Sequence, residues 1–146
     1  MLGRTHLVMG LYLFLLFDRL TTVNKLILFL IMIFASLLPD IDSARAWLGN
    51  KLVAFTFGHR GFFHSVFPVI MFAIIMQFIF NNFIYTIAFS TAYLFHLLLD
   101  SFTFQGIKPF VFGPALKGFT KTGSVVDLFL FVFLICVSLL MAFKVI

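Results

Sequence analysis

The sequence predicts an all-α membrane protein that forms one transmembrane domain over residues 1–146, and three observations support this. The 146 residues are 63% hydrophobic, only 10% of them are charged, and the mean hydropathy is +1.19. Soluble domains carry about 25% charged residues, so this composition excludes a soluble enzyme, a disordered chain and a nucleic-acid-binding domain. Long apolar runs without central charges are typical of spanning helices rather than barrel strands.

Five apolar segments are the expected transmembrane helices. At about 20 residues per span, a chain of this length allows five or six crossings. No small-residue cleavage pattern follows the first segment, so we interpret it as a retained span rather than a signal peptide. Asn81 and Asn82 predict a tight turn between the third and fourth spans. The expected spans are residues 6–22, 23 or 26–38, 62–80, 83–99 and 125–146.

Two longer connections join these spans. Residues 40–61 place Trp47 and several aliphatic residues among polar neighbours, which is typical of an amphipathic helix lying at the membrane interface. Residues 101–124 interleave Gly and Pro with five Phe, so we expect an irregular loop there rather than a span. Both connections are expected on the same face of the membrane.

The ionisable side chains are predicted to converge on that face. Five alternating spans bring together the starts of the first, third and fifth spans and the ends of the second and fourth. Ionisable residues within membrane segments are functional candidates by default. All four histidines and four of the five aspartates fall on this face, and only Asp18 lies opposite. The converging residues are His6, Asp40, Asp42, His59, His64, His96, Asp100 and Asp127.

His96 and Asp100 form the sharpest local motif. Their spacing of four places both side chains on one face of a helix. Imidazole and carboxylate groups together suit zinc or a similar divalent ion. A hydrogen bond between a His and an Asp on packed helices would explain the same spacing equally well.

A second motif covers residues 59–65, where a loop enters the third span. Gly61 permits a bend that would aim His59 and His64 inward. Arg60 is permanently charged and can bind phosphate in a bidentate manner, although a single interfacial Arg is more often a snorkelling residue. Ser65 is placed to cap the helix or to donate a hydrogen bond to a ligand.

Asp40 and Asp42 follow Pro39 at the end of the second span. Because Pro39 breaks the helix, both carboxylates are expected on irregular backbone. Paired carboxylates can bridge two cations or hold a water as a general base, which makes both residues catalytic candidates. Asp42 could instead cap a following helix.

His6 and Asp127 open the first and fifth spans. A lone His at a helix start is more often interfacial than metal-ligating, and only its convergence with the other groups makes His6 a candidate. Ser124 and Asp127 match the pattern of a helix capping box. Asp127 is therefore an equally good candidate for helix capping and for metal binding.

Together, four His and up to four Asp exceed the needs of one tetrahedral zinc. Such a set suits two or three divalent ions, most readily Zn²⁺, an arrangement used for phosphoester hydrolysis. Arg60 would offset charge in the transition state, and Lys108 would help to bind a substrate phosphate. The expected substrate is a phospholipid or a lipid-linked phosphate.

Several of these motifs resemble the small inner-membrane metal-dependent hydrolases of bacteria and archaea, the LexA-binding, membrane-associated hydrolase family. The resemblance covers nearly the whole chain and implies a metal-dependent hydrolase. That family often has an acid, usually Glu, early in its last span, where this chain has Asp127. The matching motifs are Thr5-His6 with Gly10, Leu38 to Asp42, His59 to Ser65, and His96 to Gly106.

A more distant likeness, in ligand order only, is to zinc-dependent phospholipase C and the P1-type nucleases. It implies phosphodiester or phosphomonoester chemistry in a multi-zinc site. The ligands implied by this likeness are His6, Asp40, His59 or His64, His96, Asp100 and Asp127.

Positive charge predicts the orientation in the membrane. Seven Lys and Arg residues fall on the site face and three on the opposite face. Positive residues favour the cytoplasmic side, so the N-terminus and the site are expected to face the cytoplasm from the inner membrane. The expected partners are the lipid bilayer and the lipid substrate, with no nucleic acid.

Two alternatives to a hydrolase follow from the same residues. A metal site could be structural or regulatory in a membrane protein without catalysis. Transport of a metal or a proton is a weaker alternative, because it requires polar groups through the full depth of the spans.

Overall fold

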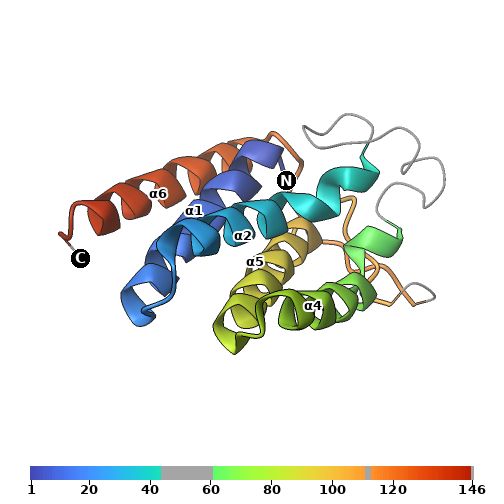
Figure 1. Ribbon diagram of the computed structural model, residues 1–146. Helices are drawn as coiled ribbons and strands as arrows, with labels where there is room; N and C mark the ends of the chain where they lie inside the picture. The colour runs from blue at the N-terminus through green and yellow to red at the C-terminus, as the bar shows by residue number, and fades with distance from the viewer. Residues whose placement is uncertain (44–60, 111–112, 146) are drawn as a thin grey trace.

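The computed structural model describes residues 1–43, 61–110 and 113–145, and this part of the chain is helical without strands. Within these residues, five α-helices and two short 3₁₀ helices, η1 and η2, follow one another (Figure 1). The predicted interfacial helix falls mainly on residues 44–60, which lie outside the described residues. The elements are α1 (Gly3–Leu20), α2 (Lys25–Leu37), η1 (Leu38–Asp42), η2 (Phe62–His64), α4 (Val66–Phe80), α5 (Phe83–Ser101) and α6 (Val125–Ala142).

The helices pack side by side with α1 and α5 at the centre of the arrangement. α1 contacts α2, α5 and α6, while α5 also contacts α2 and α4 (Figure 1). Figure 1 shows that the turns joining α1 to α2 and α4 to α5 lie at one end, with η1, η2 and the N-terminus at the other. This arrangement gathers the helix ends that the sequence predicted on one face.

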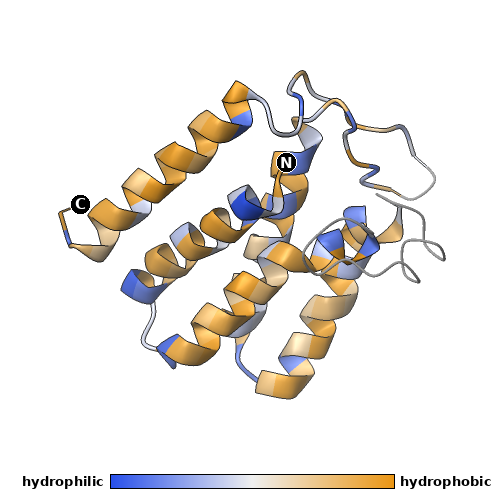
Figure 2. Ribbon diagram, turned by 90° about the horizontal axis from the view of Figure 1, so that it is seen from above, coloured by the Kyte–Doolittle hydropathy of each residue, from blue (hydrophilic) through white to orange (hydrophobic). Residues whose placement is uncertain are grey.

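The prediction of five transmembrane helices is wrong for the helices that the structure describes. By length and composition, two of them, α5 and α6, could cross a membrane. α2 and α4 have 13 and 15 residues, about 20 and 22 Å at 1.5 Å per residue, and are shorter than a hydrocarbon core of about 30 Å. α1 is long enough but carries Arg4, Asp18 and Arg19. Figure 2 shows hydrophobic helices with hydrophilic residues concentrated at their ends.

Close packing between α1 and α2 depends on small residues at their contact. A Cβ atom added to Gly10 would lie 2.9 Å from the Cβ of Ser36 and 3.2 Å from the carbonyl oxygen of Met32. Because Gly10 has no side chain and Ser36 has a small one, α1 and α2 approach closely there. This approach also sets the position of the Ser36 carbonyl, which faces α5.

Asn81 and Asn82 form the predicted tight turn between α4 and α5. Asn81 adopts a left-handed conformation with φ of 44°, which Asn tolerates better than most residues. The side chain of Asn82 caps α5 by accepting a hydrogen bond from the backbone N–H of Ile84 at 2.9 Å.

In the Gly, Pro and Phe-rich segment 102–124, the described residues 102–110 and 113–124 form a loop, as predicted. Ile107 and Leu116 form an antiparallel bridge with backbone N···O distances of 2.9 and 2.8 Å. A second bridge joins Thr103 to Thr120 and returns the loop to the end of α5. Phe102, Phe104, Phe110 and Phe119 are exposed on this loop, which leaves α5 directly after the predicted site residue Asp100.

Candidate metal centre

Four predicted ligands meet at the end where η1, η2 and α5 come together. Asp40 comes from η1, His64 from η2, and His96 and Asp100 from the last two turns of α5. One ligand atom from each residue lies within 4.8 Å of all the others. His64, His96 and Asp100 are buried, whereas 15% of the Asp40 side chain is exposed. The spacing of four residues in α5 therefore places both side chains in one cluster, as predicted.

The distances within this cluster are somewhat longer than the spacing of ligands around a single ion. Nε2 of His64 lies 3.5 Å from Oδ2 of Asp100 and 4.0 Å from Oδ1 of Asp40. Nε2 of His96 lies 3.8 Å from the same Asp40 oxygen. With metal–ligand bonds of about 2.1 Å, tetrahedral ligand atoms are about 3.4 Å apart. A small contraction of the cluster would therefore bring its atoms into coordination distance.

A backbone carbonyl orients His96. Its Nδ1 lies 2.7 Å from the carbonyl oxygen of Ser36. Because a carbonyl only accepts hydrogen bonds, Nδ1 must carry the proton, and Nε2 keeps its lone pair in the neutral ring. Nε2 is buried, faces the cluster and makes no hydrogen bond. This arrangement is common for a metal-binding His, whose second nitrogen is fixed by an outer partner.

Asp42 orients His64 in a similar way. Nδ1 of His64 lies 3.1 Å from Oδ2 of Asp42, and both side chains are fully buried. Asp42 therefore contacts the Nδ1 atom of the predicted ligand His64 and is not one of the four grouped ligand residues. The two aspartates were expected on irregular backbone, which is wrong: a 3₁₀ helix continues through Pro39 and places Asp40 and Asp42 on different sides of His64.

Burial and neighbouring charged groups shift the pKa values of His64 and Asp40, the two grouped residues that lie outside α5. Burial lowers the pKa of His64, but hydrogen bonds to Asp100 and Asp42 outweigh this effect and raise it to about 9. Burial raises the pKa of Asp40 above its usual value. The His64 proton thus supplies positive charge among carboxylates, and a divalent ion would displace this proton on binding.

Tyr93 joins η2 to α5, and Ser65 closes the η2 turn on itself. The hydroxyl of Tyr93 donates to the carbonyl of Phe63 at 2.8 Å, and that of Ser65 donates to the carbonyl of Phe62 at 2.7 Å. Ser65 makes no side-chain cap hydrogen bond to α4. The sequence analysis did not select Tyr93, although its position three residues before His96 places it near the same face of α5.

His6 borders the cluster from α1. Its ring stacks on that of His96 with centroids 3.7 Å apart and an interplanar angle of 17°. Its Nε2 lies 3.2 Å from Oδ1 of Asp100, and its buried Nδ1 makes no hydrogen bond. The terminal amine of Met1 also contacts Asp100. His6 therefore adds a third imidazole beside those of His64 and His96 in the group of four.

Asp127 lies outside the group of four ligands. Its carboxylate accepts hydrogen bonds from the hydroxyl of Thr5 at 2.7 Å and from the backbone N–H groups of Gly123 and Leu2 at 2.8 and 3.1 Å. These donors join the start of α1 to the start of α6. Ser124 is at the N-cap of α6, but its side chain makes no cap hydrogen bond and its N–H donates to the carbonyl of Lys121. The predicted capping box is therefore not formed, because the Asp127 carboxylate accepts from Gly123, one residue before the N-cap.

Of the other predicted site residues that the structure describes, Lys108 is not one of the four grouped ligands. His59 and Arg60 lie outside the described residues. Lys108 is exposed on the loop 102–124. Asp18 lies at the opposite end of α1 and pairs with Lys25 at 2.8 Å.

Comparison with known proteins places the chain in a family. A model of the YdjM inner membrane protein family matches residues 1–144. The chain belongs to the YdjM inner membrane protein family. Within the described residues, this member of the YdjM family has a cluster of Asp and His side chains that could hold a metal ion. The family match also indicates a membrane location.

A curated relative is similar over part of its length. The chain is 34% identical over 102 residues to the uncharacterized protein YvsG of Bacillus subtilis (strain 168), an alignment that spans 61% of each protein. No solved structure matches the chain.

Proposed function

We propose that this protein is a membrane-embedded, divalent-metal-dependent hydrolase of phosphoester bonds in a phospholipid or lipid-linked phosphate. The observation that carries this proposal is the meeting of Asp40, His64, His96 and Asp100 at one end of the helices. The buried His96 Nε2, which makes no hydrogen bond, supports metal binding there. Membership of the YdjM family supports a membrane setting.

The chemistry of the donors favours zinc. Two imidazole nitrogens and two carboxylate oxygens are typical ligands of Zn²⁺ and related ions. His6 would be available to a second ion, in keeping with the two or three ions expected from the sequence. A bound ion would polarise a phosphoryl oxygen and lower the pKa of a water molecule.

The side chains around the cluster have separable proposed roles. Asp40 is the most accessible of the four ligands, so phosphate and water would approach beside it, and its carboxylate would accept a proton. Asp42 and the Ser36 carbonyl would hold His64 and His96 in orientation. Arg60 and Lys108 would supply positive charge for the substrate phosphate, and Ser65 would keep His64 in place.

A non-catalytic metal site is the second candidate. Three of the four ligands are buried, and closed coordination is typical of structural zinc sites. Such a site would bind metal firmly and leave no position for a substrate. Turnover, rather than metal content, separates this candidate from the hydrolase.

Metal analysis and hydrolysis of the purified full chain test the proposal. The protein is purified in detergent with Zn²⁺, and bound metal is measured by elemental analysis. Phosphatidic acid, phosphatidylcholine and a polyprenyl phosphate are then offered as substrates, and release of phosphate or of the phosphorylated headgroup is measured. We expect bound metal and turnover of one lipid, both of which disappear in the His96→Ala, Asp100→Ala double variant.

Asp18→Asn is the matched control for this experiment. It removes a carboxylate from the opposite end of α1 and should leave metal content and turnover unchanged. Firmly bound metal without turnover of any lipid would favour the non-catalytic site. No bound metal in the wild-type protein would refute both candidates.

We further propose that the N-terminus and the metal centre face the cytoplasm from the inner membrane. The seven positive residues that the sequence predicts on that face support this orientation. A Lys121→Cys, Cys136→Ser variant should be shielded from a membrane-impermeant maleimide in intact cells and labelled after the cells are opened. Labelling in intact cells would reverse the orientation.

A further inference from the structure

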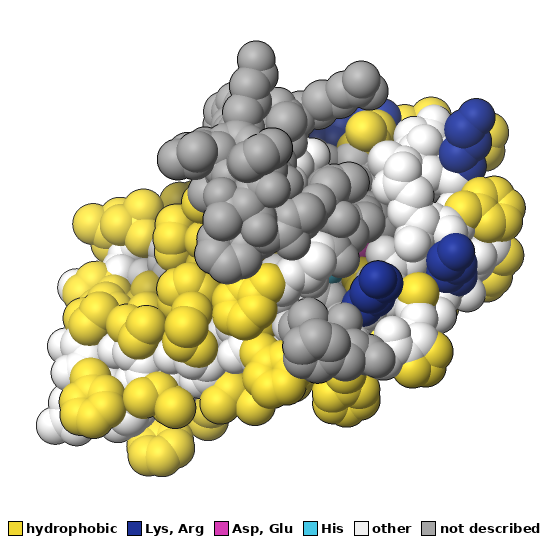
Figure 3. Space-filling model, turned by 90° about the vertical axis from the view of Figure 1, so that its right-hand side faces the viewer, with side chains coloured by type: hydrophobic (Ala, Val, Ile, Leu, Met, Phe, Trp, Pro, Cys, Tyr) yellow, Lys and Arg dark blue, Asp and Glu magenta, His cyan; other side chains and the backbone are white. Residues whose placement is uncertain are grey.

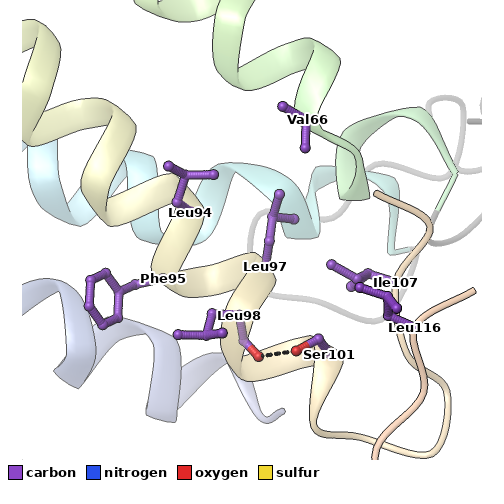
Figure 4. Close-up of a pocket in the computed structure, with 8 residues that line it drawn as sticks. All are labelled: Val66, Leu94, Phe95, Leu97, Leu98, Ser101, Ile107 and Leu116. Atoms are coloured by element: carbon purple, nitrogen blue, oxygen red, sulfur yellow. Dashed lines mark hydrogen bonds between the residues drawn. The ribbon is translucent and has the colours of Figure 1, made fainter. Parts of the chain in front are cut away.

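An apolar groove runs along the outer face of α5 beside the metal centre. Its volume is about 340 Å³, near the lower end of the 300–1,000 Å³ that is typical of small-molecule sites. α5 forms one wall, and the start of α4 and the loop 102–124 form the other (Figure 4). The lining residues are Val66, Leu94, Phe95, Leu97, Leu98, Ser101, Ile107 and Leu116.

The lining of this groove suits an aliphatic ligand. None of its side chains is charged, and the hydroxyl of Ser101 already donates to the carbonyl of Leu98 at 2.6 Å (Figure 4). A polar ligand would therefore find no free donor among these side chains and would lose its own hydration. Leu97 and Ile107 form a buried floor, with 3% and 7% exposure.

The groove is open at the protein surface, where three of its lining leucines stay exposed. Leu94, Leu98 and Leu116 keep 44%, 47% and 54% of their surface exposed. α5 is long and apolar enough to cross a membrane, so this side of the helix meets lipid chains when the protein is embedded. The groove is thus continuous with the lipid-facing surface.

Several residues that line the groove are close in sequence to the residues of the metal centre. Leu97 and Ser101 directly follow the predicted ligands His96 and Asp100, and Val66 lies two residues after His64. The backbone N–H of Val66 donates to the carbonyl of Pro109 at 3.0 Å, which fixes the loop against the start of α4. A chain in the groove would therefore end close to the cluster.

Positive charge marks the loop end of the groove. Lys108 follows Ile107 and Lys117 follows Leu116, and both lysines are exposed. Residues 101–124 contain no acidic residue that would neutralise them. Figure 3 shows dark-blue Lys and Arg side chains among hydrophobic ones on this end of the molecule. The combination complements a lipid that has an aliphatic chain and an anionic headgroup.

We propose that the groove binds one aliphatic chain of a phosphate-bearing lipid and so holds its headgroup beside the metal centre. This inference deepens the proposed function, on which it rests, because the bound lipid is the substrate. The groove positions the aliphatic chain of the lipid, and Lys108 and Lys117 favour an anionic headgroup.

Photo-crosslinking with a defined lipid tests the groove. The full chain is reconstituted in phosphatidylcholine nanodiscs that contain phosphatidic acid with a diazirine in one acyl chain, and crosslinked peptides are mapped by mass spectrometry. We expect crosslinks concentrated on residues 94–101 and 107–116. Leu98→Trp should reduce them about tenfold, because an indole at this half-exposed position fills the groove without entering the core.

Ile87→Trp is the matched control. It adds the same ring to a 52% exposed position on α5 that does not line the groove, so crosslinking should remain at the wild-type level. Equal crosslinking in the two variants, or crosslinks spread over all exposed helices, would overturn the proposal. Equally strong crosslinks from a diazirine phosphatidylcholine would overturn the preference for an anionic headgroup.

Metal content and hydrolysis, measured on the same samples, separate this inference from the proposed function. Concentrated crosslinks without turnover of any lipid phosphate would leave the groove as a lipid site and refute the hydrolase. Turnover that Leu98→Trp does not change, together with dispersed crosslinks, would support the hydrolase and refute the groove.

Discussion

Two buried aspartates at the same end of the molecule differ in the donors around them, and these donors determine whether each carboxylate can bind a metal ion. Asp100 and Asp127 are both almost completely buried, and each contacts the first residues of the chain. Asp127 accepts from two backbone N–H groups and one hydroxyl. Asp100 instead faces the ring nitrogens of His6 and His64.

The difference lies in whether the donors can give up their protons. Backbone N–H and hydroxyl donors keep theirs at all ordinary pH values, so Asp127 remains a fixed acceptor that joins α1 to α6. Imidazole nitrogens can exchange a proton for a metal ion, so Asp100 sits where a cation can be shared. Substitution of each aspartate in turn tests this distinction.

The largest effect is expected from Asp100→Asn. Loss of a ligand should weaken Zn²⁺ binding by more than about 100-fold, the upper end of the cost of losing an outer partner. Competition with a calibrated chelator measures the affinity, and circular dichroism checks that the helices remain. Wild-type affinity in a folded variant would show that Asp100 is not a ligand.

Asp127→Ala should mainly affect stability. It leaves three donors without their acceptor, so the free energy of unfolding should fall by about 2–3 kcal/mol. Denaturation in mixed micelles of the metal-free protein measures the loss, and Asp127→Asn, which keeps one acceptor oxygen, should fall between wild type and Ala. If Zn²⁺ affinity falls as far as in Asp100→Asn while stability is kept, Asp127 is a ligand after all.

Asp42→Asn is expected to have a smaller effect on the metal. The amide keeps an acceptor oxygen for Nδ1 of His64 but removes the negative charge behind the ring, so Zn²⁺ affinity should fall about tenfold. The chelator competition used for Asp100 measures this change. A loss as large as that of Asp100→Asn would make Asp42 a direct ligand.

The smallest effect is expected from Asp18→Asn. Its partner Lys25 is 71% exposed, and exposed ion pairs contribute about 0–1 kcal/mol. The melting temperature should shift by no more than a few degrees, and Zn²⁺ affinity should not change. A loss of affinity here would mean that metal binding follows global stability rather than the cluster.

The sequence predicts the helices better than their number of membrane crossings. Apolar runs and the Asn81 turn locate the elements, because hydropathy and turn chemistry are local properties. Hydropathy does not show that α2 ends at Leu37 and is followed by a 3₁₀ helix, or that α4 begins only at Val66. These two helices are therefore shorter than the apolar runs that contain them.

The candidate site is predictable where its chemistry is local and not where it depends on packing. The spacing of His96 and Asp100 and the alternation of helices place Asp40 and His64 beside them. The contact between Asp42 and His64 and the use of the Ser36 carbonyl depend on how η1, η2 and α2 meet α5. In the sequence, Asp127 is an equally good candidate for helix capping and for metal binding. Only the positions of Thr5 and Gly123 in the fold distinguish these two roles.

The distribution of the four ligands along the chain has a consequence for biogenesis. Asp40 is synthesised early, but Asp100 belongs to the end of α5 and leaves the ribosome much later. The donor set is therefore incomplete until α5 has been inserted and has packed against α2. A chain that ends before α5 would therefore offer only Asp40 and His64 of this donor set.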